Sequence, residues 1–357
     1  MKPLIKKKQP KQELPTRITN ETVAEHRETI LAGGRRFKYP LQYAKHRLVI
    51  NAVIIAAATV ALMSGLVWWQ LYLAQNTGDL MYRVTKAVPL PVGSVDGESV
   101  AYSDYLLNYR PAEHYLNKFD EIKSDSEDGR LQLQHKKREA LDLAISDAYA
   151  RKLARELNLK VTDEELMKEI NASRIAENGE QSIDAYEDSM MRILGVDREG
   201  TRSLIRNSLL RAKVAFEIDK TAADIIKEAE VLASQHKGDL QKAFAALEQT
   251  YKGSVAMGSS GKISLSTSFG GVSANTVAKL PIGQVSSIIK SVTEEGYYIV
   301  KLDEKDDKQI SFSYILVPLT EFKNRLASLN KDGKIKEYIS IKIDEPKTST
   351  TDSEEGK

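Results

Sequence analysis

The sequence contains no cysteine among its 357 residues. This absence excludes a disulfide framework, a thiol nucleophile and a thiolate metal site. The net charge is only +2, which gives no overall reason to expect a nucleic-acid partner. Histidine is scarce, and no histidine has a second histidine or a pair of carboxylates at ligand spacing. We therefore expect no metal, no cofactor and no nucleic acid. The five histidines are His26, His46, His114, His135 and His236.

Residues 48–69, LVINAVIIAAATVALMSGLVWW, lack charge altogether over 22 positions. About 20 apolar residues in a helix are needed to cross the hydrocarbon core of a bilayer. Trp68 and Trp69 lie at the far end, where amphipathic rings favour the interface between membrane and water. A buried helix of a soluble domain would normally show a polar stripe, which is missing here. The sequence predicts one transmembrane helix that joins two arms of unequal size.

Charge is distributed unevenly around this apolar stretch. Residues 1–47 contain 12 Lys or Arg against 4 Glu, whereas residues 70–88 contain only Arg83 and Lys86 against Asp79. Basic flanks are retained in the cytoplasm, so we expect a cell-membrane protein that crosses once, with its amino-terminus cytoplasmic and its carboxy-terminal arm extracytoplasmic. A cleaved signal peptide would have a shorter apolar core and small residues at its cleavage site. The 47 preceding residues favour an uncleaved signal anchor instead.

The outer arm begins with the segment GSVDGESVAYSDY at residues 93–105. An Asp-Gly pair between short apolar runs predicts a strand, a tight turn at Asp96-Gly97 and then a helix. The pattern stays helical to about residue 219, with a capping box at Thr162 and Glu165. We expect a mostly helical domain over residues 93–220.

Beyond residue 220 the composition changes. Residues 222–251 are helical in pattern, a loop rich in Gly and Ser follows, and three β-rich runs come after it. These features predict an α+β domain with a small antiparallel sheet. The expected organisation is a basic cytoplasmic tail (1–47), a transmembrane signal anchor (48–74), a linker (75–92), the helical domain (93–220), the α+β domain (221–342) and a disordered tail (343–357).

Two resemblances to known families accompany these patterns. GSVDGESVAYSDY and the order of helices after it are similar to the chaperone domain of the foldases SurA, PrsA and PpiD, over about residues 93–218. The later segment LPIGQVSSIIKSVTEEGYYIVKL resembles the end of the parvulin (PpiC) type of peptidyl-prolyl isomerase, and the resemblance extends over about residues 222–302. The first resemblance implies a polypeptide-binding scaffold, and the second implies an isomerase fold.

The parvulin family has two central histidines, in a "H-I-L-V" strand and in a "G-Y-H-I" strand. The resemblance places Tyr298 at the second position, and Tyr314 in Ser313–Val317 at the first, if residues 310–317 pair antiparallel with residues 296–302. The domain is then either circularly permuted, or followed by a truncated second repeat. The family's apolar slot for the prolyl ring implies four substrate-binding residues here. These are Leu265, Val277, Leu280 and Ile299.

Tyrosine cannot reproduce a coupled pair of histidines, and the family's Trp-Phe wall is absent. The sequence therefore favours a membrane-tethered extracytoplasmic chaperone that binds unfolded or newly secreted polypeptides, with a parvulin-like domain that lacks meaningful isomerase activity. One alternative is a working peptidyl-prolyl isomerase, and another is a structural envelope protein that binds one fixed partner. Further expected partners are membrane lipid and the secretion translocase.

Overall fold

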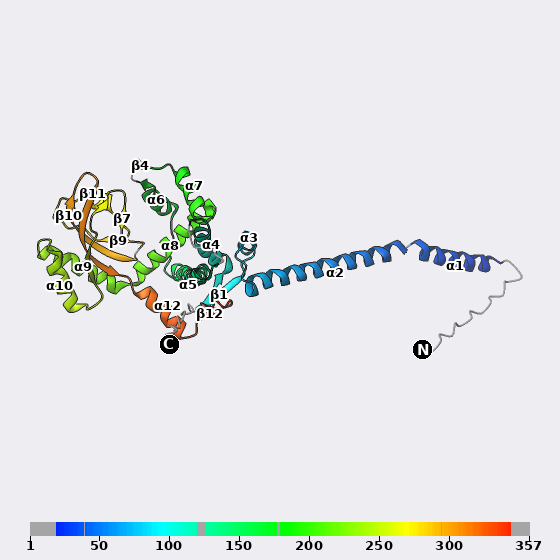
Figure 1. Cartoon of the computed structure of the whole chain (residues 1–357). Coiled ribbons are helices and arrows are strands. Elements are labelled where there is room, and N and C mark those ends of the chain that lie inside the picture. Colours follow the sequence, from blue (N-terminus) through cyan, green and yellow to red (C-terminus); the bar gives the residue numbers. More distant parts are fainter. Residues whose placement is uncertain (1–18, 39, 120–125, 177–178, 294, 344–357) are drawn as a thin grey trace, which may run out of the picture. The chain divides into compact units, whose positions relative to one another are not determined.

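A computed structural model describes residues 19–38, 40–119, 126–176, 179–293 and 295–343. The chain divides into two compact units, residues 1–69 and 70–357 (Figure 1). The first eighteen residues of the predicted basic tail, and the predicted disordered tail from residue 344, lie outside the described residues.

The first unit consists of two helices, α1 (Asn20–Lys38) and α2 (Pro40–Trp68), and α2 continues into a π-helical turn, η1 (Trp69–Leu73). The helical stretch His46–Leu73 is long and apolar enough to cross a membrane, and none of its most apolar part is buried inside protein. Large side chains such as Ile55 and Leu62 are well exposed. These observations oppose the alternative of a core helix, because a core helix would be covered by other parts of the chain.

The second unit opens with a helical domain. Its first hairpin joins β1 to β2 through Asp96 and Gly97, which both have positive φ (47° and 82°), as the predicted Asp-Gly turn requires. The capping box at Thr162 and Glu165 is also confirmed, with both reciprocal hydrogen bonds present. The elements in chain order are α3 (Asp79–Ala87), β1 (Pro91–Val95), β2 (Glu98–Ala101), α4 (Tyr102–Phe119), α5 (Glu127–Glu156), α6 (Asp163–Ser173), β3 (Ile175–Ala176), β4 (Gly179–Glu180), α7 (Ile183–Leu194) and α8 (Arg198–Ile218).

The structure shows a packed helix where the sequence predicts a linker over residues 75–92. Helix α3 buries Met81, Tyr82 and Thr85 on one face and packs against α4. Pro89 and Pro91 suggest a stiff connector in the sequence, but the three inward residues of α3 recur at helical spacing and attach the segment to the domain. The helical domain therefore begins before residue 93.

A sheet domain follows, built around strands β5, β11, β10 and β9 in that spatial order, with β6 also paired to β11. Helices α9 and α10 pack on one face of the central strands (Figure 1). The hairpin β7–β8 and α11 contribute to the apolar cluster on the other face. The elements are α9 (Lys220–Gln235), α10 (Leu240–Thr250), β5 (Ala256–Ser259), β6 (Ile263–Ser264), β7 (Ser268–Phe269), β8 (Val272–Ser273), α11 (Ala274–Val277), β9 (Ile289–Ser291), β10 (Gly296–Lys305) and β11 (Gln309–Pro318).

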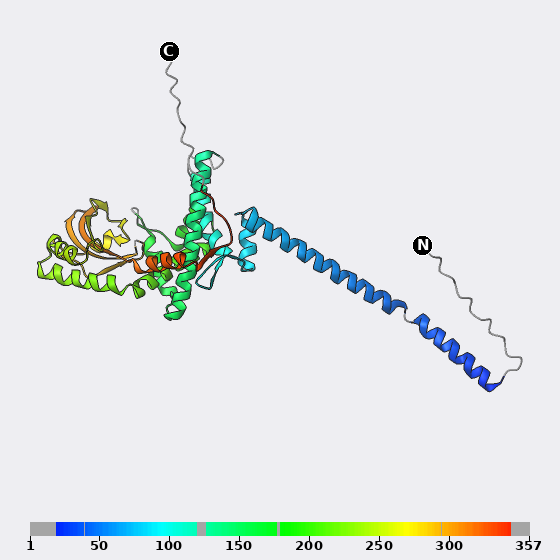
Figure 2. The ribbon, with the colours of Figure 1, turned by 90° about the horizontal axis from the view of Figure 1, so that it is seen from below.

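The chain then returns to the helical domain. After β11 come α12 (Glu321–Lys331) and β12 (Ile335–Glu337), seen in orange and red in Figure 2. Strand β12 pairs antiparallel with β1, with Gly93 opposite Glu337, so the small sheet has the order β12-β1-β2. The predicted carboxy-terminal bound of the α+β domain, residue 342, is therefore revised to about residue 319.

Asp219 lies where the chain leaves and re-enters the helical domain. Its carboxylate is buried, with one oxygen accepting from the backbone N–H of Ala222 at 2.9 Å. The other oxygen accepts from the N–H groups of Thr320 and Glu321 at 2.8 and 3.0 Å. One carboxylate thus caps the starts of both α9 and α12. The sheet domain is an insertion whose two ends meet at this residue.

Candidate functional sites on the sheet and on the helical domain

The structure brings the two predicted tyrosines of the sheet together. Strands β10 and β11 are paired antiparallel, which is the arrangement that the permuted alternative requires, with Tyr298 opposite Leu316 and Val300 opposite Tyr314. The two tyrosines are therefore diagonal neighbours on the same face, within reach of each other across adjacent strands. Their ring centroids lie 5.5 Å apart.

Phe269 and Phe312 complete an aromatic cluster around this pair. The ring centroid of Phe269 lies 5.5 Å from that of Tyr314 and 6.1 Å from that of Phe312. Tyr298 and Phe312 are buried, whereas Phe269 and Tyr314 are half-buried. Tyr314 is therefore the more accessible of the two tyrosines.

Glycine backbone makes room for both tyrosine hydroxyls. A Cβ at Gly270 would collide with the hydroxyl of Tyr298, and a Cβ at Gly258 would collide with the hydroxyl of Tyr314. Gly258 lies directly opposite Tyr314 in the pairing of β5 with β11. A side chain at either glycine would displace a tyrosine, so the position of the pair depends on these two residues.

The predicted substrate-binding residues divide between the two faces of the sheet. Leu265, Val277 and Leu280 pack against the cluster that contains Tyr298. Ile299 is fully buried on the opposite face, beneath α9 and α10. Successive side chains of a strand point to opposite faces, so Ile299 cannot share the face of Tyr298. The structure therefore groups three of the four predicted residues with Tyr298 and places Ile299 on the other face.

A second candidate site is a cavity of about 380 Å³ on the helical domain. Its wall contains both positively and negatively charged side chains, which are ion-paired or hydrogen-bonded. Arg110 binds Asp79 at 2.9 Å, and the Thr77 hydroxyl donates to Glu113 at 3.1 Å. Backbone and side-chain donors and acceptors of a peptide find partners on such a wall. The lining residues are Thr77, Gly78, Asp79, Arg110, Glu113, His114, Asn117, Lys118 and Gly195.

Two exposed aromatic side chains on α4 lie outside the lining of this cavity, and one of them contacts a lining residue. Tyr115 and Phe119 are 50% and 51% exposed, with ring centroids 5.6 Å apart. Phe119 also contacts His114, a lining residue, at 6.3 Å between ring centroids. Sequence reasoning missed this pair. The available signal was their spacing of four residues at the end of a helix whose other aromatic residues face inward.

Burial changes the protonation behaviour of neighbouring groups. The ammonium of Lys137 lies 5.7 Å from the ring centroid of Tyr109, and burial lowers the pKa of Lys137. Burial also raises the pKa of Tyr109, whose hydroxyl is 3.3 Å from Glu113. Desolvation disfavours the charged form of each group. In the described part of the chain, no group of three or more potential ligands is placed to hold a metal ion.

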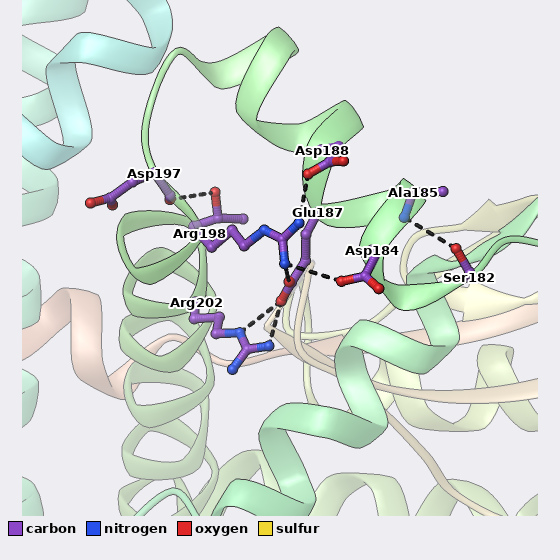
Figure 3. A network of polar contacts seen from close by, with 9 residues as sticks. Ser182, Asp184, Ala185, Glu187, Asp188, Asp197, Arg198 and Arg202 are labelled. Atoms are coloured by element: carbon purple, nitrogen blue, oxygen red, sulfur yellow. Dashed lines mark hydrogen bonds and ion pairs between the residues drawn. The ribbon is translucent and has the colours of Figure 1, made fainter.

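A buried carboxylate fixes the corner between α7 and α8 (Figure 3). Gly195, which ends α7, lines the cavity. Glu187 is only 3% exposed and accepts from Arg202 Nε at 2.7 Å. Arg198 lies 3.4 Å from Glu187 and also binds Asp188 at 2.7 Å, as Figure 3 shows. A buried charge is tolerated only when it is paired in this way. The network therefore sets the position of α7 relative to α8.

Comparison with known proteins supports one of the two resemblances. Residues 42–215 match the family described as the SurA-like N-terminal domain. No curated protein and no solved structure matches the chain. The chain therefore contains a SurA-like domain that runs from the apolar helix through most of α8, whereas the likeness to parvulins rests on sequence motifs and on the paired strands alone.

Proposed function

We propose that this protein is a membrane-tethered, extracytoplasmic chaperone that binds unfolded or translocating secreted polypeptides. The observation that carries the proposal is the SurA-like match over residues 42–215, which includes both the apolar helix and the helical domain. The basic residues before the apolar helix support a cytoplasmic amino-terminus. The expected partners are client polypeptides, membrane lipid and the secretion translocase.

The cavity beside Tyr115 and Phe119 is the best-supported client site in the helical domain. Exposed aromatic side chains are costly for a protein that binds nothing there, and contiguous exposed apolar surface commonly marks an interaction site. The adjoining polar wall offers hydrogen-bond partners for an extended backbone. Together these features suit a chain segment that has apolar side chains and an unpaired backbone.

The tether contributes through effective concentration. A domain attached to the bilayer meets chains that emerge from the same bilayer far more often than a free domain would. Weak binding at a small, partly polar site is therefore sufficient. This argument favours a chaperone with low affinity for many clients over a binder with a single tight partner.

The test uses the full chain in lipid vesicles and an unfolded client whose aggregation is followed by light scattering. We expect suppression by the parent and a several-fold loss in the Tyr115→Ser/Phe119→Ser variant. The matched control is Val231→Ser/Ile282→Ser, which removes two comparably exposed apolar side chains from the sheet domain. No suppression by the parent would overturn the chaperone proposal. Equal suppression by both variants would overturn only the assigned client site.

A second candidate function is peptidyl-prolyl isomerisation. The observation in its favour is the tyrosine pair on one face of β10 and β11, in the arrangement that a circularly permuted parvulin would give. Isomerisation needs no covalent chemistry, only a pocket that lowers a barrier of about 18–20 kcal/mol. Proline-dependent turnover that Tyr314→Phe abolishes without loss of fold would establish this alternative. Tight binding to one folded partner would instead indicate a structural envelope protein.

A further inference from the structure

The folded domain begins almost immediately after the apolar helix. Leu71 is fully buried in the second unit, only two residues after Trp69. The Tyr102 hydroxyl donates to the carbonyl oxygen of Leu71, and the Tyr72 hydroxyl donates to that of Pro91, each at 2.6 Å. The second unit is therefore ordered from Leu71 onward, two residues after the uncharged stretch ends.

The length of the helix then fixes which residues lie at the membrane surface. A hydrocarbon core of about 30 Å takes about 20 helical residues, and the headgroup layers add roughly 5–8 Å on each side. If residues 48–67 fill the core, Gln70 and Leu71 lie within the headgroup layer. The chain turns back at this level, because the N–H of Asn76 donates to the carbonyl of Gln70 at 2.9 Å. Helix α3 starts three residues later.

The carboxy-terminal segment lies beside the same residues. The Gln75 side chain donates to the carbonyl oxygen of Ser340 at 2.9 Å. The N–H of Tyr338 donates to Val92 at 2.9 Å, which continues the pairing of β12 with β1 toward this end. Residues 338–343 are therefore held against the turn that follows the apolar helix.

Large apolar side chains are exposed on both of these segments. Leu80 is 68% exposed and Val88 is 52% exposed on and just after α3, although the opposite face of α3 is buried. Tyr338 and Ile343 are 47% and 42% exposed. Leu73 lies between the segments in sequence and is 59% exposed. Exposure of these apolar side chains to water is unfavourable, whereas the interface of a bilayer accommodates aliphatic and tyrosine side chains.

We propose that these five side chains form a membrane-facing surface that rests in the lipid headgroup layer of the bilayer crossed by the apolar helix. The five are Leu73, Leu80, Val88, Tyr338 and Ile343. The inference rests on the membrane tether of the proposed function. Its partner is the lipid surface itself. Thr77, Gly78 and Asp79 belong to the same stretch and also line the candidate client cavity, so that cavity lies close to the bilayer.

Single-cysteine labelling tests the surface directly, because the chain has no native cysteine. The full chain is reconstituted in phosphatidylcholine vesicles with an environment-sensitive fluorophore at one position. Lipids that carry a quencher near the headgroup or deep in the acyl chain report its depth. We expect the shallow quencher to act on labels at positions 80 and 338, at least about twofold more than on a label at position 282. Position 282 serves as control because Ile282 is 65% exposed in the sheet domain.

A label at position 60, inside the apolar helix, separates the possible failures. Deep quenching at position 60 without shallow quenching at 80 and 338 would overturn the membrane-facing surface and leave the tether intact. Absence of quenching at position 60 would overturn the tether and this inference with it. Quenching at 80 and 338 that an excess of unfolded polypeptide abolishes would assign the surface to clients, and would also overturn the inference.

Discussion

The helical domain and the sheet domain are stabilised in different ways. The helical domain buries two carboxylates, Asp147 and Glu187, each paired with arginine. The sheet domain is built from two apolar clusters, one on each face of its central strands. The described residues of the sheet domain also form ion pairs with one another, and these pairs lie at the surface. Lys227–Asp224 is one example.

Asp147 shows what the buried charges do. Its carboxylate lies 2.5 Å from Arg211 of α8 and within 3.4 Å of the side-chain amides of Asn108 and Asn207. One residue of α5 thus contacts both α4 and α8. Long helices can slide past one another by one turn without losing much apolar contact, whereas strands are held by alternation of their side chains. Buried polar contacts therefore align the helices, whereas the alternation of side chains between the two faces aligns the strands of the sheet.

The largest effect is expected in the sheet domain. Phe312 is fully buried in the aromatic cluster, so Phe312→Ala should cost about 4 kcal/mol by loss of contacts and creation of a cavity. Hydrogen exchange should show loss of protection in β10 and β11 with α5 still protected. Ile282→Ala, at an exposed position, is the control and should change little. Equal loss of protection in α5 would contradict separate stabilisation of the two domains.

A slightly smaller effect is expected for the buried charge of the helical domain. Asp147→Asn leaves Arg211 without its closest carboxylate, and breaking a buried pair in this way costs about 3 kcal/mol. Urea unfolding of the domain reports the change. The control is Asp224→Asn on α9, which removes one partner of an exposed pair and should have little effect. Similar effects of the two substitutions would show that burial does not distinguish the charges.

Asp219 offers a way to uncouple the two domains. Asp219→Ala removes the cap of α9 and leaves two N–H groups of α12 without their acceptor, at a cost of about 2 kcal/mol. Exchange should accelerate together in the first turns of α9 and α12. In the control Asp239→Ala, only the first turn of α10 should change, because Asp239 caps that helix alone. Unchanged exchange in α12 would contradict a shared cap.

The smallest effect concerns pH and helix α6. A hydrogen bond from Lys213, together with one from the N–H of Thr162, lowers the pKa of Glu165. A lowered pKa contributes stability above the unfolded value of about 4.3, and that stability is lost as pH falls through the folded pKa. Glu165→Gln keeps an oxygen for the capping box but loses the charge. We expect a deficit of under about 1 kcal/mol at pH 7, since the pair is partly exposed.

Urea unfolding of the parent and of Glu165→Gln at pH 7 and at pH 3 measures this difference. The difference should shrink as the pH falls through the folded pKa of Glu165, because the carboxyl group loses its charge there. A deficit of the same size at both pH values would show that the glutamine geometry, rather than the charge, causes it.

Local patterns in the sequence were sufficient for several features. The Asp96-Gly97 hairpin, the capping box at Thr162 and the apolar helix each depend on residues that are neighbours in the chain. The sequence offered the pairing of β10 with β11, through a short hairpin at residues 303–308, as one of two open arrangements. The structure has this pairing, which brings Tyr298 and Tyr314 together.

Other features depend on contacts between distant residues. The sequence gives no sign that Asp219 caps a helix about a hundred positions later, or that β12 returns to β1. The face of Ile299 was not readable from the sequence, because the first five residues of β10, GYYIV, carry no charge and are all buried, so they show no alternation. Tyr115 and Phe119 resemble core residues in composition, and their spacing of four residues at the end of α4 was the only local signal of their exposure.

Local sequence is sufficient to establish the uncharged helix, the side on which its basic residues lie, and the SurA-like helical domain and small antiparallel sheet that follow. These features arise from composition and from short-range periodicity, which persist whatever the rest of the chain does. The tertiary contacts show that the predicted linker contains a packed helix, that the sheet domain is an insertion closed at Asp219, and that residues near Ser340 contact Gln75. Each of these depends on burial and on hydrogen bonds between segments far apart in the chain, which no local pattern specifies.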